Sequence, residues 1–131
     1  MIKLLLVLFF LNQNNLNISP NKLKEIIDKD NPIDILIDVR TLEEVNDSKI
    51  PNSINIDYYH NSFEKSLDSL DKNFNYFIYC RSGNRSMKTV NILKSKGFEN
   101  AFNLQGGIIA WKEEGFITIS IKKERAGNQL S

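Results

Sequence analysis

The chain has 131 residues, which is enough for one globular domain. Its hydrophobic fraction of 41% and charged fraction of 25% exclude a disordered tail, a collagen-like rod and a multi-span membrane protein. Lys and Arg number 17 against 16 Asp and Glu, a formal net charge of +1. Because the positive and negative charges are nearly equal in number, no surface-wide field attracts nucleic acid or anionic lipid. Any bound anion must therefore be held locally.

The sequence contains one cysteine, Cys80, and one histidine, His60. A single thiol cannot form an internal disulfide, and one Cys with one His does not supply a structural zinc site. We therefore expect no metal and no cofactor. We expect His60 to have a surface or loop-packing role, whereas Cys80 would act alone as a nucleophile or as a carrier of a transferred group.

Residues 1–11 form an apolar run interrupted only by Lys3, within a hydrophobic N-terminal segment over residues 1–16. The run is shorter than the ~20 residues of a membrane-spanning helix. Its length and the early positive charge predict a signal peptide and hence export to the periplasm. The folded domain would then cover residues 17–121, with a polar tail at residues 122–131. The alternative is a cytoplasmic protein in which the run is a strand or helix packed on the core.

Downstream, β-rich runs alternate with helical patterns, which predicts an α/β fold with three layers, a parallel sheet between helices on both faces. Ser19 and Pro20 are typical of an N-cap and a first helical residue. A buried strand is predicted over residues 33–39. After it, Thr41 and Glu44 have the spacing of a capping box and predict a short helix.

The next strand is predicted over residues 50–56, followed by a helix spaced by Phe63 and Leu67. Aromatic and β-branched residues predict a strand over residues 76–79, which delivers Cys80 at its carboxyl end.

A helix after the cysteine is expected to end at Gly97, because glycine is favoured just past a helix C-terminus. Residues 101–104 predict a last short strand. Gly106 and Gly107 then turn the chain into a helix around Trp111.

The most informative segment is residues 79–86, Tyr-Cys-Arg-Ser-Gly-Asn-Arg-Ser. It lies between a predicted strand and a helix N-terminus, where ligand sites of open α/β sheets are found. Successive amides in a tight glycine-containing loop can converge on an anion, and the helix adds its positive end. A cysteine sulfur at that point is favoured as the thiolate.

This loop predicts both the reactive atom and its surroundings. Cys80 is the expected catalytic residue, since a small buried apolar role would not account for two arginines and a glycine at this spacing. The two arginines at the rim suit an oxyanion substrate. The expected substrate-binding residues are the five that follow the cysteine: Arg81, Ser82, Gly83, Asn84 and Arg85.

Four segments in register carry a further signal: residues 37–40, 50–56, 79–86 and 104–108, the last followed by Trp111. In this order they resemble the single-domain rhodanese family of sulfurtransferases, over about residues 18–116. The resemblance implies a five-stranded parallel sheet with helices on both sides.

The resemblance also implies a reaction and further roles. Cys80 would take a sulfane sulfur from thiosulfate or a related donor, hold it as a persulfide and pass it to cyanide, a thiol or a protein acceptor. Asp38 and Arg40 would be structural neighbours of the site, and Gly106 with Gly107 would form a packing turn. The balanced charge and the short apolar run lead us to expect no nucleic-acid partner and no stable membrane span, and a single domain of this size is expected to act as a monomer.

Four other functions are alternatives to an enzyme that turns over thiosulfate. A Cdc25-like cysteine phosphatase or an arsenate reductase is disfavoured, because four residues separate Cys80 from Arg85 where the phosphatase pattern has five, and Tyr79 stands where a histidine is usual. A pure binding module would typically lack the cysteine or the loop arginine. A persulfide carrier fed by another protein, with little thiosulfate turnover, stays open.

Overall fold

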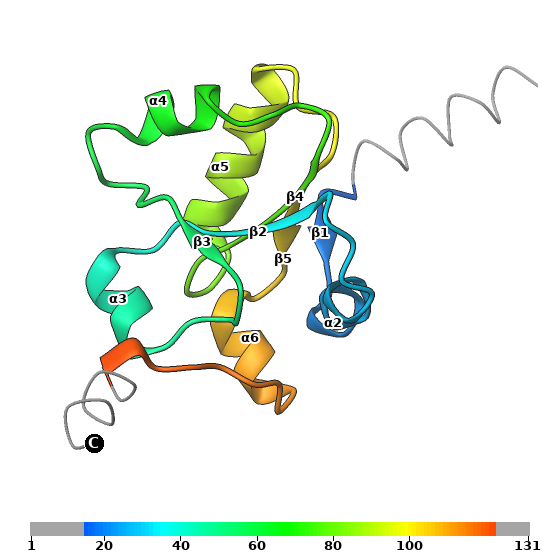
Figure 1. Ribbon diagram of the computed structural model, residues 1–131, viewed down its shortest axis with the longest axis vertical. Coiled ribbons are helices and arrows are strands. Elements are labelled where there is room, and N and C mark those ends of the chain that lie inside the picture. The colour runs from blue at the N-terminus through cyan, green and yellow to red at the C-terminus, as the bar shows by residue number, and fades with distance from the viewer. Residues whose placement is uncertain (1–14, 123–131) are drawn as a thin grey trace, which may run out of the picture.

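The computed structural model describes residues 15–122 and has a five-stranded parallel sheet at its centre, in the order β1-β5-β4-β2-β3 (Figure 1). The strands are β1 (Asn17–Ile18), β2 (Asp34–Asp38), β3 (Ile54–Asn55), β4 (Asn75–Tyr79) and β5 (Ala101–Leu104). The helices are α2 (Pro20–Asp28), α3 (Leu42–Asp47), α4 (Phe63–Asp68), α5 (Asn84–Ser95) and α6 (Gly107–Glu113).

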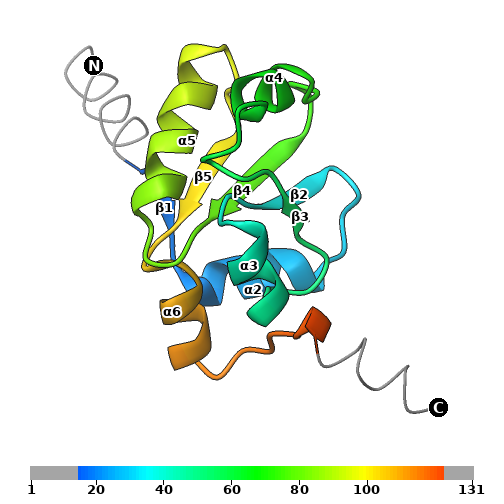
Figure 2. The same ribbon diagram turned by 90° about the vertical axis from the view of Figure 1, so that its left-hand side faces the viewer.

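Helices cover both faces of this sheet. Helices α4 and α5 lie on one face, and α2, α3 and α6 lie on the other (Figure 2). Each face has its own apolar cluster: Leu67 and Val90 are fully buried on the first, and Leu23 and Trp111 are buried on the second. The predicted three-layer α/β fold is therefore confirmed.

Local signals in the sequence begin and end several elements. The hydroxyl of Ser19 accepts a hydrogen bond from the Lys22 amide at 3.1 Å and caps α2. Thr41 and Glu44 form the expected capping box of α3. Gly97 follows the end of α5 with a φ of +92°, a left-handed conformation that glycine adopts without strain.

The strand predicted over residues 50–56 is wrong for its first half. Residues 50–53 form a turn, in which the Ser53 amide donates to the Ile50 carbonyl at 3.3 Å and Asn52 has a φ of +65°. The Ile50 amide donates instead to the hydroxyl of Tyr79 at 3.1 Å. Since this side-chain partner replaces a strand partner, β3 begins only at residue 54.

The periodicity of the sequence did not predict the first strand, and the two ends of the chain lie outside the described residues. The edge strand β1 is only two residues long, so it carries no readable alternation, and it forms by pairing with β5. The predicted signal peptide lies outside the described residues up to residue 14, as does the polar tail from residue 123.

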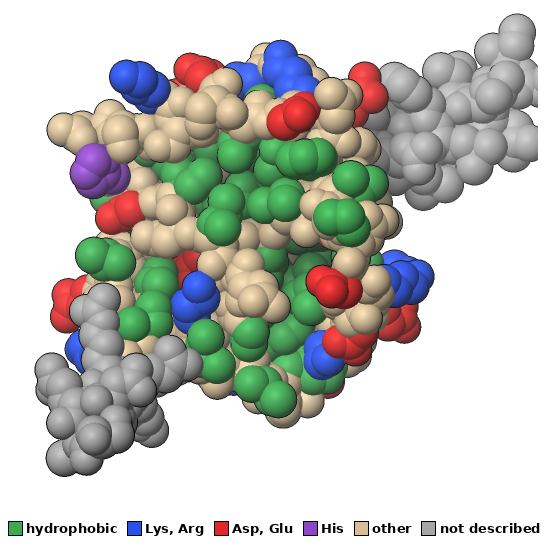
Figure 3. All heavy atoms as spheres, viewed as in Figure 1, with side chains coloured by type: hydrophobic (Ala, Val, Ile, Leu, Met, Phe, Trp, Pro, Cys, Tyr) green, Lys and Arg blue, Asp and Glu red, His purple; other side chains and the backbone are tan. Residues whose placement is uncertain are grey.

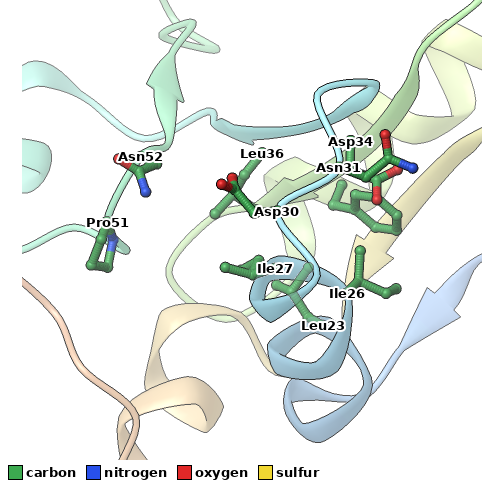
Figure 4. Close-up of a pocket in the computed structure, with 10 residues that line it drawn as sticks. Leu23, Ile26, Ile27, Asp30, Asn31, Asp34, Leu36, Pro51 and Asn52 are labelled. Atoms are coloured by element: carbon green, nitrogen blue, oxygen red, sulfur yellow. The ribbon is translucent and has the colours of Figure 1, made fainter.

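The described surface contains apolar side chains gathered in the middle of one face (Figure 3). A hollow of about 80 Å³ opens there between α2 and β2, with Ile27 and Leu36 among its walls and Asp30 at its side (Figure 4). It lies toward the amino ends of the strands, whereas Cys80 follows the carboxyl end of β4. The hollow is therefore separate from the cysteine.

Two kinds of feature are absent from the described part of the chain. Within residues 15–122, no helix combines the length and the apolar composition needed to cross a bilayer. In the same range, no three or more His, Cys, Asp or Glu side chains are grouped so that they could hold a metal ion.

Candidate active site

Cys80 opens the connection between β4 and α5, which we call the cysteine loop (residues 80–86). The strand before it is buried on both faces and pairs with β2 on one side and β5 on the other. Cys80 is only 1% exposed and packs at the end of the core cluster that includes Val39 and Val90. The thiol is thus placed at the carboxyl edge of the sheet, where the sequence predicted it.

Hydrogen-bond donors converge on the sulfur of Cys80. The Gly83 amide lies 3.1 Å from Sγ, and the Ser86 hydroxyl donates to Sγ at 3.2 Å. Burial acts to raise the pKa of Cys80, but hydrogen bonds from the Ser86 hydroxyl and from the amides of Ser86, Gly83 and Ser82 outweigh it, so the pKa lies below its ordinary value. The loop therefore favours the nucleophilic thiolate.

Ser86 is the residue at this sulfur that the predicted set left out. It is fully buried in the first turn of α5, directly after Arg85. The available signal was its place in the loop segment, because a small hydroxyl side chain in the first turn of a helix can face the loop that precedes it.

The loop backbone is held from behind by α6. The Ile108 amide donates to the Cys80 carbonyl at 3.0 Å, and the Ile109 amide donates to the Arg81 carbonyl at 3.2 Å. A Cβ atom at Gly107 would lie 2.3 Å from the Arg81 carbonyl oxygen, so only glycine permits this approach. Two carbonyls of the loop thus face α6, while loop amides face the sulfur.

The five expected substrate-binding residues lie around the sulfur in different settings. Arg81, Ser82 and Asn84 are exposed, and Gly83 adopts a φ of +106° as the residue before α5. Within residues 15–122 no carboxylate forms an ion pair with Arg81. Arg81 is therefore a rim cation that a substrate can reach.

The sequence predicted that Arg85 binds an oxyanion substrate, but in the structure its guanidinium is bound by a carboxylate of the chain itself. Its two terminal nitrogens bond both carboxylate oxygens of Glu44, at 2.8 and 2.9 Å. The ring of Tyr59 lies 5.7 Å from the guanidinium carbon. Glu44 and Tyr59 were not predicted as site residues, since they come from other connections and no local pattern links them to the loop.

Asp38 and Arg40 form a buried ion pair with a 2.8 Å contact between Nη2 and Oδ2. Asp38 is paired with Tyr79 in the sheet register, one residue before the cysteine. Arg40 reaches away from the sulfur and donates to the carbonyl of Ser48 at 2.6 Å, beyond the end of α3. These two charged residues therefore adjoin the site and hold its framework.

His60 lies on the exposed connection between β3 and α4, at the edge of the face in Figure 3. Its Nδ1 accepts a hydrogen bond from the Ser62 amide at 3.1 Å. It also lines a hollow of about 290 Å³ together with Leu42, Ile56 and Phe63. The contacts of His60 are therefore those of a loop-packing residue.

Chemically, this site is a thiol whose ionised form is stabilised by amide and hydroxyl donors, with a reachable cation at the rim. Such an arrangement suits nucleophilic attack by sulfur and stabilisation of a sulfur anion. Four residues separate Cys80 from Arg85, and within this span the Gly83 amide turns back to the Cys80 sulfur at 3.1 Å.

Comparison with known proteins identifies the class to which this fold and loop belong. The rhodanese-like domain model matches residues 19–114. The chain therefore belongs to the rhodanese-like domain family, and the resemblance found in the sequence is confirmed.

Individual relatives agree with this assignment. YtwF of Bacillus subtilis (strain 168), a protein provisionally named a sulfurtransferase, is 39% identical over 97 residues, covering 74% of this chain and 90% of YtwF. YrkF of the same organism, provisionally named a sulfur carrier protein, is 33% identical over 94 residues, and this chain spans about half of it, 49%. The match covers 72% of this chain.

A solved structure shows the same fold. The crystal structure of a rhodanese-related protein from Thermoplasma volcanium superposes with a TM-score of 0.69 at 31% sequence identity, covering 79% of this chain and 96% of that one.

Proposed function

We propose that this protein is a sulfurtransferase whose Cys80 takes a sulfane sulfur from thiosulfate or a related donor, carries it as a persulfide and delivers it to a thiophilic acceptor. The observation that carries the proposal is the sulfur of Cys80 within 3.1 Å of the Gly83 amide and 3.2 Å of the Ser86 hydroxyl. The names of the related proteins point to the same chemistry.

The cycle would have two displacements. The Cys80 thiolate attacks the outer sulfur of the donor, the donor's S–S bond breaks, and the electron pair leaves with sulfite when the donor is thiosulfate. An acceptor thiolate or cyanide then attacks the outer sulfur of the persulfide, and the Cys80 thiolate returns. The loop amides stabilise the negative sulfur before and after transfer, while Arg81 attracts the donor.

A second function, a persulfide carrier loaded by another protein, is favoured by one observation on the relatives. YrkF is named as a sulfur carrier rather than as an enzyme. The same Cys80 persulfide would serve both functions, and they differ in whether small donors turn over repeatedly.

The test is intact-protein mass spectrometry of the wild type and Cys80→Ser after incubation with thiosulfate or with cysteine hydropersulfide. We expect the wild type alone to gain one sulfur atom, which cyanide removes as thiocyanate. Cys80→Ser is a clean control because the chain has no other cysteine. A wild type that gains sulfur from neither donor would contradict the proposal, and loading without turnover would identify the carrier.

A further inference from the structure

With Cys80 as the thiolate, the charges of the cysteine loop and of the carboxylate paired with it sum to zero before any donor arrives. The thiolate and Glu44 each contribute one negative charge, and Arg81 and Arg85 each contribute one positive charge. Arg85 is bound by both oxygens of Glu44, so its charge is compensated by a fixed carboxylate. Thiosulfate is a dianion, and this group, in which the thiolate is already counted, has no net positive charge to attract it.

Glu44 is held in its ionised form at this place. Its carboxylate also accepts hydrogen bonds from the amide and hydroxyl of Thr41 in the capping box of α3. Hydrogen bonds from Arg85 lower the pKa of Glu44 to about 2. The side chains of Arg85 and Glu44 are 16% and 30% exposed, so water and salt screen the pair only partly. The same carboxylate therefore caps α3 and binds Arg85.

The shape of the site points in the same direction. Cys80 is 1% exposed, so its sulfur offers little surface to a donor. The outer sulfur of thiosulfate is attached to a tetrahedral sulfite group, whereas that of an alkyl persulfide is attached to a slimmer divalent sulfur on a carbon stem. Tyr59, whose ring lies 5.7 Å from the guanidinium carbon of Arg85, is 68% exposed and would contact such a stem.

From these observations we infer that the sulfur donor of this site is the persulfide of an organic thiol rather than thiosulfate, and that Glu44 determines this preference. The inference rests on the proposed function. The Cys80 thiolate attacks the terminal sulfur of R–S–SH, and the donor S–S bond breaks. Its electron pair leaves with R–S⁻, and the proton stays on the transferred sulfur, giving Cys80–S–SH. The reacting S–SH group of this donor brings at most one negative charge.

The test compares second-order rate constants for loading of Cys80 by thiosulfate and by cysteine hydropersulfide, followed by quenched intact-mass analysis. The wild type should load faster from the persulfide. Glu44→Gln frees the charge of Arg85 and should raise the thiosulfate rate constant about three- to tenfold, with a steeper salt dependence. The persulfide rate constant should change less than about twofold, because that donor carries less charge.

Glu43→Gln is the matched control. Glu43 is the exposed neighbour of Glu44 in the first turn of α3, and among the described residues it forms no ion pair. Its removal makes the same change in net charge and should alter neither rate constant. An equal gain in both variants would show a general charge effect and would overturn the role of Glu44.

The two proposals fail in different ways. A wild type that loads faster from thiosulfate overturns this inference while the sulfurtransferase function stands, and this measurement does not depend on the folding of any variant. A wild type that loads from neither donor overturns the function itself. A third arm with the persulfide on a cysteine-containing peptide separates the sources, since faster loading from the peptide supports a protein donor and faster loading from the free compound a small one.

Discussion

Two arginine–carboxylate pairs hold the short helix α3, and their surroundings differ. Arg40 with Asp38 is 4% and 0% exposed, and Arg40 reaches the carbonyl of Ser48 after the C-terminus of the helix. Arg85 with Glu44 is 16% and 30% exposed and lies at the helix N-terminus, beside the cysteine loop. An arginine–carboxylate pair is thus buried in the framework at the C-terminal end of α3, and another borders the candidate site at its N-terminal end.

The difference teaches that burial decides what an ion pair does. Removing one partner of a buried pair leaves an uncompensated charge in the interior, so that pair is tied to folding. Removing one partner of a partly exposed pair leaves a charge that water can reach, so its effect on stability is small. Removing Glu44 would still change the net charge near the sulfur of Cys80, and this connects Glu44 to the choice of sulfur donor.

The largest expected effect is on stability. Arg40→Met should lower the free energy of unfolding by about 3–5 kcal/mol, because Asp38 would stay buried without a partner. Arg85→Met should lower it by about 1 kcal/mol or less, because Glu44 is partly hydrated. Urea denaturation of both variants and the wild type measures the difference. Equal losses would show that burial does not distinguish the two pairs.

A smaller effect is expected on the thiol. Ser86→Ala should raise the pKa of Cys80, because the hydroxyl that donates to the sulfur is lost. Ser53→Ala is the matched control. Ser53 is also a buried serine, but its hydroxyl bonds the hydroxyl of Tyr79 and not the sulfur of Cys80, and Arg40 lies over the Tyr79 ring. The rate of iodoacetamide alkylation against pH gives the pKa. A shift of equal size in both variants would contradict the role of Ser86.

The smallest expected effect is the pH dependence of the rim pair. Because the pKa of Glu44 is lowered from 4.5 to about 2, its ion pair stabilises the fold above pH 4.5 and this contribution is lost as the pH falls toward 2. After allowance for solvent screening, the loss should be about 1 kcal/mol. Urea denaturation across this window should show the loss in the wild type and in Glu43→Gln, but not in Glu44→Gln. Parallel curves for all three proteins would exclude the contribution.

How far the sequence predicted this structure depends on the range of each interaction. Ser19 and Thr41 cap helices through bonds to residues three positions away, and both caps were predicted. The strand over residues 50–56 was predicted too long, because the hydroxyl of Tyr79, 29 residues further on, takes the amide of Ile50. An apolar run looks like a strand until such a distant partner is known.

The sequence by itself determined the three-layer fold, the position of Cys80 after a buried strand and the amide-rich loop around it, because each depends on neighbouring residues and on the periodicity of burial. Only the tertiary structure decided that Arg85 pairs with Glu44, 41 residues away, and that Gly107 lies against the Arg81 carbonyl. Assembly of the sheet brings these groups together. The charge of the candidate site is therefore a property of the folded chain, since the partner that compensates Arg85 lies on another connection.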